Sequence, residues 1–442
     1  MLQCATPHRS VMSRPPSLDV RFDAGRLTAD GGLPWLAEAE AALGLCRAVA
    51  AAIPDWRRGP VRHTLETLVR QRVFQIACGY EDQDDADLLR ADPLLKLVCG
   101  RLPETGADLA SQPTMSRLEN AVDGRTCARL ADVVFALYVR ERGRAGPPRR
   151  LLLDIASTDD PTHGAQEGTA YHGFFRQHMY HPLLVFDGDT DQLVVAALRA
   201  GNAHAGQGVV PLLGALVPAL RAQWPRVPIE IRVDGVEAGP DLYACCEAAA
   251  VDYTVGLPPN RRLAMLAEPL RTVAEAWQAW TGADKVRLVG DTTYQAGSWP
   301  RPRRVVIKTE VTAKGTNTRF VVTSRTDPPR ALYDRYVDRG EAEGWIKDLK
   351  HACFADRLSD HRFWANQFRL LLHAVAYWLL DTIRRWLVAA GADRLQLDTL
   401  RLRLLKIGGW VEQLASGARL HLASHHPSEA LWRLLVVHRG PP

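Results

Sequence analysis

Three carboxylates of the sequence occupy positions from which they could hold metal ions for phosphoryl transfer. Asp154 lies in an expected strand, LLLDIAST, Asp234 ends another, IEIRVDG, and Glu343 lies on an expected late helix. Where two such strands end side by side beneath such a helix, their carboxylates can hold two Mg²⁺ ions about 4 Å apart, one activating the attacking oxygen and the other stabilising the leaving oxygen. Carboxylate oxygens are the ligands that Mg²⁺ prefers. A single Asp at a strand end is more often a turn residue or a helix cap, but three at these positions favour a catalytic site.

The expected helix around Glu343, RYVDRGEAEGWIKDLK, gathers further polar residues along one side. Tyr336, Glu343 and Lys350 recur every seventh position, and Arg339 and Lys347 lie four residues to either side of Glu343. At about 100° per residue these positions share one face, with a drift of roughly 20° per seven residues. That face carries a carboxylate flanked by cations and a phenol. A solvated face with Glu–Lys pairs at four-residue spacing is the competing interpretation.

The spacing of apolar residues predicts which elements position these side chains. Residues 34–143 show apolar positions at three- and four-residue steps, typical of helices, and the period changes after the linker RGRAGPPRR. Three strands, a helix, a strand, a helix and a strand then follow, which is the order of the RNase H-like fold. A helical piece and three more strands interrupt that fold before the helix of Glu343, and the tail after it reads as helical.

We therefore expect an α/β protein with an RNase H-like catalytic core interrupted by an inserted β-rich subdomain. The expected regions are a helical N-terminal DNA-binding or dimerisation domain (1–145), the first part of the core (146–258), the inserted mainly β subdomain (259–330), the last core helices (331–385) and a helical C-terminal region (386–442).

Composition and charge narrow the classes of protein. With 442 residues, 47% of them hydrophobic and 24% charged, the chain is long enough for two or three domains with real cores. No apolar run spans a bilayer and no signal peptide is evident, so we expect a cytoplasmic protein. The eight cysteines show no zinc or disulfide spacing, and we expect reduced thiols. A net charge of +5 is a weak hint of a polyanionic partner, but basic clusters interleaved with Trp and Tyr are the composition that a nucleic-acid surface needs.

The late helix also carries a family resemblance. The spacing of Tyr336, Arg339, Glu343 and Lys350 fits the Y-x-x-R-x-x-x-E-x(6)-K signature of DDE transposases from bacterial insertion sequences of the IS-four-related type. The surrounding segments DIASTDDPTHGAQEG, IRVDGVEAGPDLYACCEAAAVDY and HRFWANQFRLLLHAVAYWLL resemble the IS thirteen-eighty family in particular. The resemblance extends to RFDAGRLTADGGL and GYEDQDDADLLRADPLLK, so it covers nearly the whole chain.

One position departs from the family pattern. Family members usually read D-x-D-[AS]-[ST] on the first strand, with the catalytic Asp two residues before the Ser or Thr, and here that position is Ala156. Asp154 points to the same strand face but lies roughly 6.6–6.8 Å away, too far to replace it simply at a metal. Ala156 could be an inactivating substitution of the kind used to trap a complex on DNA, natural decay, or a sign that Asp154 serves with a shifted backbone. The first explanation is favoured because the rest of the site is undamaged.

The resemblance implies roles for other residues. Tyr336, Arg339 and Lys350, with Lys347 beside them, would contact phosphates near the scissile bond, Arg as a two-pronged donor and Lys as a point charge. Trp299, in GSWPRPRR with Arg303 and Arg304, would stack on a displaced base, although burial within the inserted subdomain is equally expected. In the N-terminal region, Arg117 lies on a short polar helix that would suit a DNA groove, with a plain helical hairpin as the alternative. His163, His172, His178 and His181 are interpreted as satisfied or substrate-facing rather than metal-binding.

The predicted function is a cut-and-paste DNA transposase in the bacterial cytoplasm, associated with the nucleoid. It would bind the terminal inverted repeats of its element as double-stranded DNA, pair them as a homodimer in a synaptic complex, cleave the ends with Mg²⁺ (Mn²⁺ is expected to substitute) and join the 3′-hydroxyls to target DNA. A hairpin intermediate is expected by analogy. Two other classes remain open: an RNase H-like nuclease without strand transfer, and an inactive transposase-derived DNA-binding protein or repressor.

Overall fold

The computed structural model describes residues 23–235 and 239–440, which fall into two compact units. Unit 1 comprises the chain up to Arg47, Arg57–Arg117 and Leu379 onward, and unit 2 comprises Ala48–Trp56 and Leu118–Trp378. Within the described ranges, no helix is long and apolar enough to cross a membrane.

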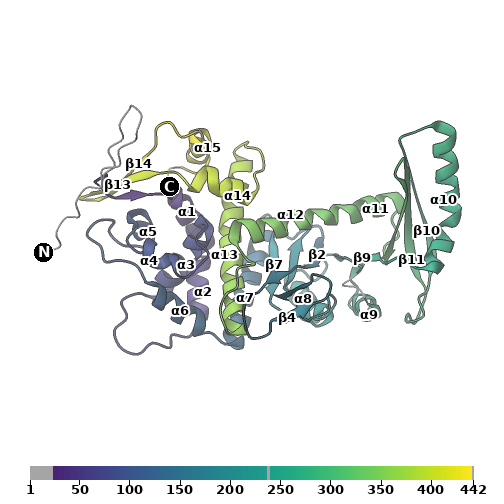
Figure 1. The fold of residues 1–442 in the computed structure, drawn as a ribbon, viewed down its shortest axis with the longest axis horizontal. Coiled ribbons are helices and arrows are strands. Elements are labelled where there is room, and N and C mark those ends of the chain that lie inside the picture. The colour runs from purple at the N-terminus through teal and green to yellow at the C-terminus, as the bar shows by residue number, and fades with distance from the viewer. Residues whose placement is uncertain (1–22, 236–238, 441–442) are drawn as a thin grey trace, which may run out of the picture. The chain divides into compact units, whose positions relative to one another are not determined.

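Unit 1 combines the N-terminal helices with the C-terminal part of the chain (Figure 1). Its elements, some of which cross into unit 2, are β1 (Leu27–Thr28), α1 (Leu33–Leu43), α2 (Leu45–Ala52), α3 (Leu65–Cys78), α4 (Asp85–Leu89), α5 (Pro93–Val98), α6 (Gln112–Asn120), α13 (Phe363–Ala389), α14 (Leu397–Leu400), a π-helical turn (Arg401–Leu405), β13 (Gly409–Leu414), β14 (Gly417–Leu422) and α15 (Glu429–Arg439). Asp30 ties the two ends of the chain together, since it forms an ion pair with Lys406 at 2.7 Å and accepts a hydrogen bond from Tyr80 at 2.9 Å.

The C-terminal region is not entirely helical, which corrects the expectation for 386–442. Strands β13 and β14 pair antiparallel, and β1 adds a third strand through Leu27 and Thr28. One of the two strands that pair with β13, β1, comes from the other end of the sequence. The spacing of residues within the tail gives no sign of this pairing.

Unit 2 is built on one mixed sheet of eight strands, ordered β10-β11-β12-β9-β8-β2-β6-β7. Strand β2 pairs parallel with β8 and β8 parallel with β9, while the other pairs are antiparallel. The strands of this sheet are β2 (Leu151–Ser157), β6 (Leu183–Asp187), β7 (Leu193–Ala197), β8 (Ile229–Val233), β9 (Asp252–Leu257), β10 (Lys285–Tyr294), β11 (Arg303–Thr312) and β12 (Gly315–Thr323). Central strands β2 and β8 are buried along nearly their whole length, as their continuous apolar runs predict.

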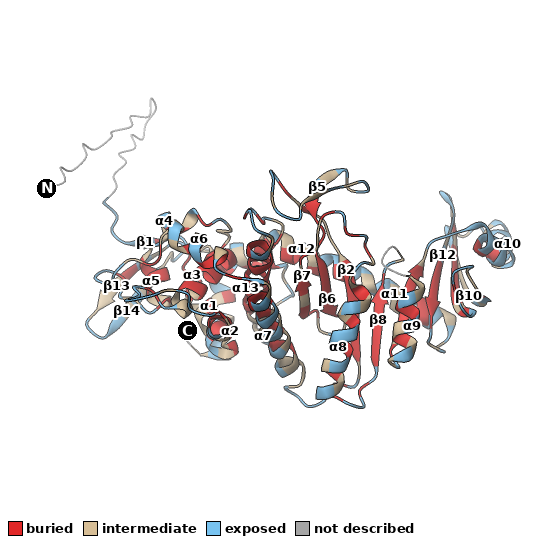
Figure 2. Cartoon of the chain, turned by 90° about the horizontal axis from the view of Figure 1, so that it is seen from below, coloured by how far each residue is buried: buried red, intermediate tan, exposed pale blue. Residues whose placement is uncertain are grey.

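Helices cover both faces of this sheet. Helices α8 (Val209–Gln223) and α9 (Pro240–Ala248) lie on one face, and α11 (Pro329–Val337) and α12 (Glu341–Lys347) lie on the other (Figures 1 and 2). The remaining elements of unit 2 are α7 (Gly124–Arg142), α10 (Arg261–Thr281), the short strands β3 (Asp160–Pro161), β4 (Ala170–His172) and β5 (Gln177–Tyr180), a 3₁₀ turn (Asp338–Gly340) and a π-helical turn (Asp348–Ala352).

The segment expected to form an inserted subdomain instead extends the main sheet. Strand β12 pairs antiparallel with β9, from Phe320 opposite Leu257 to Thr323 opposite Thr254. Strands β11 and β10 continue the same sheet, and α10 packs on them through Ala267 and Ala274. The strands predicted there are therefore present, but they share the sheet of the core.

Candidate active site

Strand β8 carries polar residues on the sheet face that meets α11. Glu230 and Arg232 are 3% and 2% exposed, and Asp234 follows directly after the strand. Side chains two residues apart point to the same face of a strand, so these three form a row. Buried charges persist only when they are paired, and each member of this row has an ionic partner.

The partner of Arg232 is Asp154 on the neighbouring strand β2. The guanidinium donates from Nε to Oδ1 and from Nη2 to Oδ2, both at 2.6 Å, and it also donates from Nη1 to the carbonyl oxygen of Arg335 at 2.6 Å. Burial raises the pKa of Asp154 above its usual value, and the hydrogen bonds and charge of Arg232 act in the opposite direction. Gly188 packs so closely that a Cβ there would lie 2.5 Å from Oδ2 of Asp154. Both oxygens of Asp154 are thus engaged within the protein.

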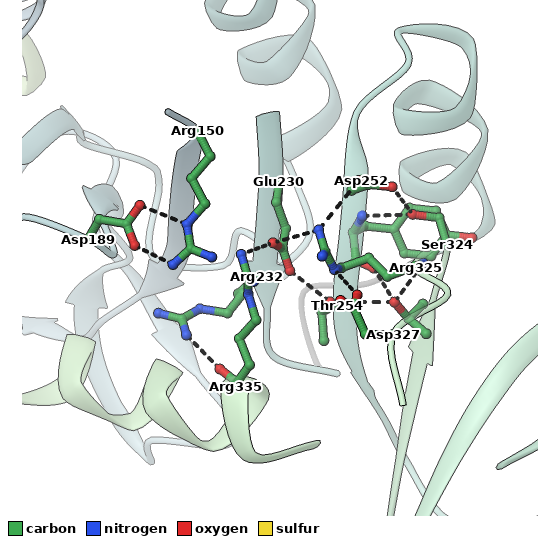
Figure 3. A network of polar contacts seen from close by, with 12 residues as sticks. Arg150, Asp189, Glu230, Arg232, Asp252, Thr254, Ser324, Arg325, Asp327 and Arg335 are labelled. Atoms are coloured by element: carbon green, nitrogen blue, oxygen red, sulfur yellow. Dashed lines mark hydrogen bonds and ion pairs between the residues drawn. The ribbon is translucent and has the colours of Figure 1, made fainter. Parts of the chain in front are cut away.

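Glu230 joins β8 to β9 and to the start of the late helix (Figure 3). Its Oε2 accepts from Nη2 of Arg335 at 2.5 Å and from Nη1 of Arg325 at 3.3 Å, and Oε1 accepts from the hydroxyl of Thr254 at 3.1 Å. Together with the bond from Arg232 to Arg335, these contacts fix α11 against the sheet. The network therefore positions Tyr336 and Arg339, which follow on the same helical segment.

Position 156 lies beside Asp234. Strands β2 and β8 pair parallel in register, with Asp154 opposite Arg232 and Ile155 opposite Val233. One further step along the same register brings Ala156 next to Asp234, at the roughly 4.8 Å spacing of adjacent strands. Ala156 is 4% exposed and shares the face of Asp154, two residues earlier. A carboxylate at position 156 would therefore point to the sheet face covered by α11 and α12, next to the carboxylate of Asp234.

Tyr336 and Arg339 both approach Asp234. Arg339 Nη1 lies 3.8 Å from Oδ2 of Asp234, whose side chain is 54% exposed. The Tyr336 hydroxyl packs on Gly256, where a Cβ would lie 2.3 Å from it and 3.3 Å from Oδ1 of Asp234. Burial, then the negative charge of Asp234, raises the pKa of Tyr336 to about 12. The phenol therefore remains a neutral hydrogen-bond donor at neutral pH.

Asp234, Gly256 and Tyr336 border an open pocket of about 580 Å³. Its wall combines Asp234 and Tyr336 with two cations, Lys308 and Arg319. A pocket with cations beside a carboxylate suits a phosphodiester that is held close to a reacting centre.

The helix of Glu343 is interrupted twice, which divides the expected polar face. The 3₁₀ turn Asp338–Gly340 and the π turn Asp348–Ala352 flank α12, so residues seven apart do not keep one direction. Glu343 and Lys347 are exposed, whereas Nζ of Lys350 donates to the backbone oxygen and to Oδ1 of Asp159, both at 2.9 Å. Burial alone would raise the pKa of Asp159, but the hydrogen bond and charge of Lys350 outweigh it and lower that pKa.

The donor set does not fit the expected magnesium site. Asp154 has both oxygens on Arg232, and Ala156 offers no oxygen from its side chain. Over residues 23–235 and 239–440, no three or more His, Cys, Asp and Glu side chains form a group that could hold a metal ion. Asp234 and Glu343 are the expected ligands that remain available.

Of the other expected DNA contacts, the structure gives three an internal packing role. Trp299 is 6% exposed and packs edge-on against Tyr243 and Tyr294, each with a centroid distance of 5.4 Å. Arg303 is 5% exposed and donates to both oxygens of Glu247. Arg304 donates to Asp291 and to the backbone oxygens of Arg325 and Asp327. Arg117, on α6, is exposed.

Sequence reasoning missed Glu230, Arg232 and Asp159. A signal for the first two was present, because EIRVD places charges at alternate positions of a strand that is otherwise apolar and central. Charges on the inner face of such a strand must be paired, which points to a polar network. Asp159 offers no such signal, since its partnership with Lys350 joins residues 191 apart in the sequence.

The family model described as "Transposase DDE domain group 1" matches residues 11–439. A piggyBac transposase, in a synaptic complex with hairpin DNA, is a similar solved structure, with 12% sequence identity, a TM-score of 0.44 and coverage of 86% of this chain and 80% of the other. No curated protein matches the sequence.

Proposed function

This chain belongs to the group 1 family of transposase DDE domains, and from that premise we propose that it is a cut-and-paste transposase of a bacterial insertion sequence whose cleavage step is disabled at Ala156. The proposal that cleavage is disabled rests on the register of β2 against β8, which brings position 156 beside Asp234. A carboxylate there would complete the pair of neighbouring acids that a DDE site requires, and alanine removes it.

The sheet supports an RNase H-like core. Strands β7-β6-β2-β8-β9 run in the order and directions of that fold, with β6 antiparallel to both β2 and β7, and with β8 and β9 parallel to β2. Helix α8 precedes β8 and α9 precedes β9. Asp234 then lies at the end of the fourth strand of the core, and Glu343 lies on the helix that crosses the same face.

On this proposal, Asp154 is a structural residue. The Arg232 guanidinium engages both of its oxygens in a buried pair, so serving a metal would require the pair to break. Its part is to hold β2 and β8 in register and, through the bond from Arg232 to Arg335, to anchor the last turn of α11. Position 156 is then the ligand position on β2, as the family pattern implies.

DNA recognition is proposed for the cations around this site. Arg339 beside Asp234 and Tyr336 at the pocket would contact the phosphate next to the scissile bond. Lys350 would exchange its hydrogen bonds with Asp159 for a DNA phosphate, and the exposed Lys347 and Arg117 would add backbone contacts. Pairing of two ends by a homodimer, a hairpin intermediate and joining to target DNA are parts of the same proposal, as is association with the nucleoid.

A second candidate, a DNA-binding repressor of its own element, is favoured by the same alanine. It shares every binding feature and differs only in lacking chemistry. An RNase H-like nuclease would share the acids but would not need Tyr336 and Arg339 beside Asp234. Strand-transfer assays on the Ala156→Asp variant separate these classes, because a transposase joins its 3′-ends to target DNA and a nuclease only cuts.

Binding is the test that needs no restored chemistry. The chain as it exists should bind a duplex carrying the terminal inverted repeat that flanks its gene more tightly than a scrambled duplex of the same length and composition, measured by fluorescence anisotropy at physiological salt. Equal affinity for the two duplexes would contradict end recognition, since phosphate contacts alone do not select a sequence.

A further inference from the structure

A short hairpin rises beside the proposed site, between β2 and β6. Strands β4 and β5 pair with Tyr171 opposite His178 and His172 opposite Gln177, and the chain turns through residues 173–176. Arg176 closes the turn by donating its backbone N–H to the oxygen of His172 at 2.8 Å, with a left-handed φ of 56°. In Figure 2 the loop around β5 stands out from the body of the unit, and β5 is buried only toward its end.

The tip of this hairpin exposes aromatic rings. Phe174 is 83% exposed and Tyr171 is 56% exposed. The Phe174 ring is supported on one side by Phe175, against which it packs edge-on with ring centroids 5.0 Å apart. The Phe175 ring in turn packs on His172, with centroids 5.1 Å apart. A supported ring that faces solvent loses little conformational freedom when it binds a flat partner.

The turn end of β5 is joined to the proposed DNA-contacting Lys350 through Asp159. Its Oδ1 accepts from Nζ of Lys350 and its Oδ2 accepts from Nε2 of Gln177, both at 2.9 Å. Asp159 lies three residues after Ala156 in the sequence. The hairpin and Lys350 are therefore fixed to the same point at the end of β2.

The charge of the hairpin fits a polyanion. Between residues 161 and 182 the one cationic side chain is that of Arg176, which is exposed at the tip, and the one carboxylate is Glu167. Oε2 of Glu167 accepts from the backbone N–H of Phe363 at 3.0 Å, at the root of the hairpin. The carboxylate nearest the tip, Asp159, is half-buried and is engaged by Lys350 and Gln177. Exposed rings beside a cation are what stacking on a nucleic-acid base next to a phosphate requires.

We infer that this hairpin binds the transposon end by stacking Phe174 on a base that has left its pair, with Arg176 on the adjacent phosphate. The inference rests on the proposed function and assigns to Phe174 the stacking that sequence reasoning expected of Trp299, which is buried. An unpaired base is the partner because the faces of paired bases are covered by their neighbours in the stack. The exposed ring of Tyr171 extends the same surface.

The test compares four duplexes on the chain as it exists: the terminal repeat and a scrambled sequence, each fully paired or with three unpaired nucleotides at the cleavage end. Anisotropy gives the ratio of affinities for frayed and paired DNA. We expect the wild-type chain to prefer the frayed ends and Phe174→Ala to lose about 5- to 150-fold of that preference. Phe174→Trp should retain it, and Arg176→Ala should weaken binding to all four duplexes and lower the salt dependence by about one phosphate contact.

A matched control is Trp280→Ala, which removes a ring of similar exposure, 85%, from α10 and should leave the preference unchanged. The inference is overturned if the wild-type chain shows no preference for frayed ends, or if Phe174→Ala keeps it. It is also overturned if the variant changes only the oligomeric state, since Phe174 would then face a second copy of the chain. Failure of the proposed function reads out separately, as equal affinity for repeat and scrambled duplexes.

Discussion

Replacing Arg232 by Met should destabilise unit 2 severely, because it leaves the buried carboxylate of Asp154 without its ionic partner. Asp154 is fully buried and Arg232 is 2% exposed, and two hydrogen bonds of 2.6 Å join them. Removing one partner of such a pair costs about 3–5 kcal/mol, since the remaining charge has neither water nor a counter-ion. The lost hydrogen bond to the oxygen of Arg335 adds to this and loosens the last turn of α11.

The double variant Arg232→Met/Asp154→Leu supplies the control. An apolar pair of similar volume leaves no buried charge, so its stability should return to within about 2 kcal/mol of the wild-type chain. The pH dependence of the stability of Arg232→Met separates the effect of the buried charge from the effect of lost packing. Because burial raises the folded-state pKa of Asp154 and Arg232 opposes that shift, the single variant should have a still higher pKa. A carboxyl with a raised folded-state pKa stabilises the fold below its unfolded pKa and loses this as pH rises through the folded value, so the deficit of Arg232→Met should be larger at pH 8 than at pH 5.

Urea unfolding followed by circular dichroism gives the free energies, and hydrogen exchange of peptides from β2 and β8 assigns the loss to this pair of strands. A single variant that loses less than about 1 kcal/mol would refute the structural role of Asp154. So would a double variant whose loss equals the sum of the losses of Arg232→Met alone and Asp154→Leu alone, because the two side chains would then not be coupled.

Three further predictions follow from neighbouring contacts. Trp299→Ala should lower the free energy of unfolding by about 3–5 kcal/mol while leaving the preference for frayed DNA unchanged, as measured by urea unfolding and anisotropy, because the ring is buried. Gly256→Ala should displace the Tyr336 hydroxyl, which lies 2.3 Å from the added Cβ, and weaken end binding about as much as Tyr336→Phe does; a normal affinity would contradict the placement of that phenol. Burial, then the charge of Glu119, raises the pKa of Asp360 to about 6, so this group stabilises the fold below about pH 4 and loses up to about 3 kcal/mol as pH rises through 6. Unfolding of Asp360→Asn across pH 4–8 should lack that decline, and an unchanged profile would contradict it.

The fold was predictable where local pattern and pairing agree. Strands such as LLLDIAS and IEIRV are short, apolar and bounded by polar residues, and their order between helices indicates a parallel central pair. The sequence also predicted that Asp234 and position 156 lie at the ends of two strands, and the register of β2 and β8 brings those ends together; their role in catalysis stays a prediction.

What the sequence did not reveal depends on contacts between distant segments. The tail after Leu400 reads as a helix, but β1 supplies a strand edge from the other end of the chain and β13 pairs with it. Trp299 could not be judged buried or exposed, because Tyr243 and Tyr294 pack on it from two other elements. The seven-residue repeat of the late helix assumed one helical geometry, and the 3₁₀ and π turns alter it.

The sequence did not show that Asp154 pairs with Arg232, although it did suggest that the charges of β8 have buried partners. Alternating charges in EIRVD imply buried partners, but they do not say whether Arg232 pairs with Asp154 or with a residue of the late helix. The parallel register of β2 and β8 decides this, and register is a property of the pair of strands rather than of either segment.

The role of position 156 is decided by cleavage of labelled transposon-end DNA in Mg²⁺ or Mn²⁺, with this chain and Ala156→Asp side by side. We predict that both proteins bind the ends with similar affinity and that only Ala156→Asp cuts them, because the new carboxylate lies beside Asp234. If the chain with Ala156 cuts equally well, another group completes the site and the assignment of position 156 is wrong.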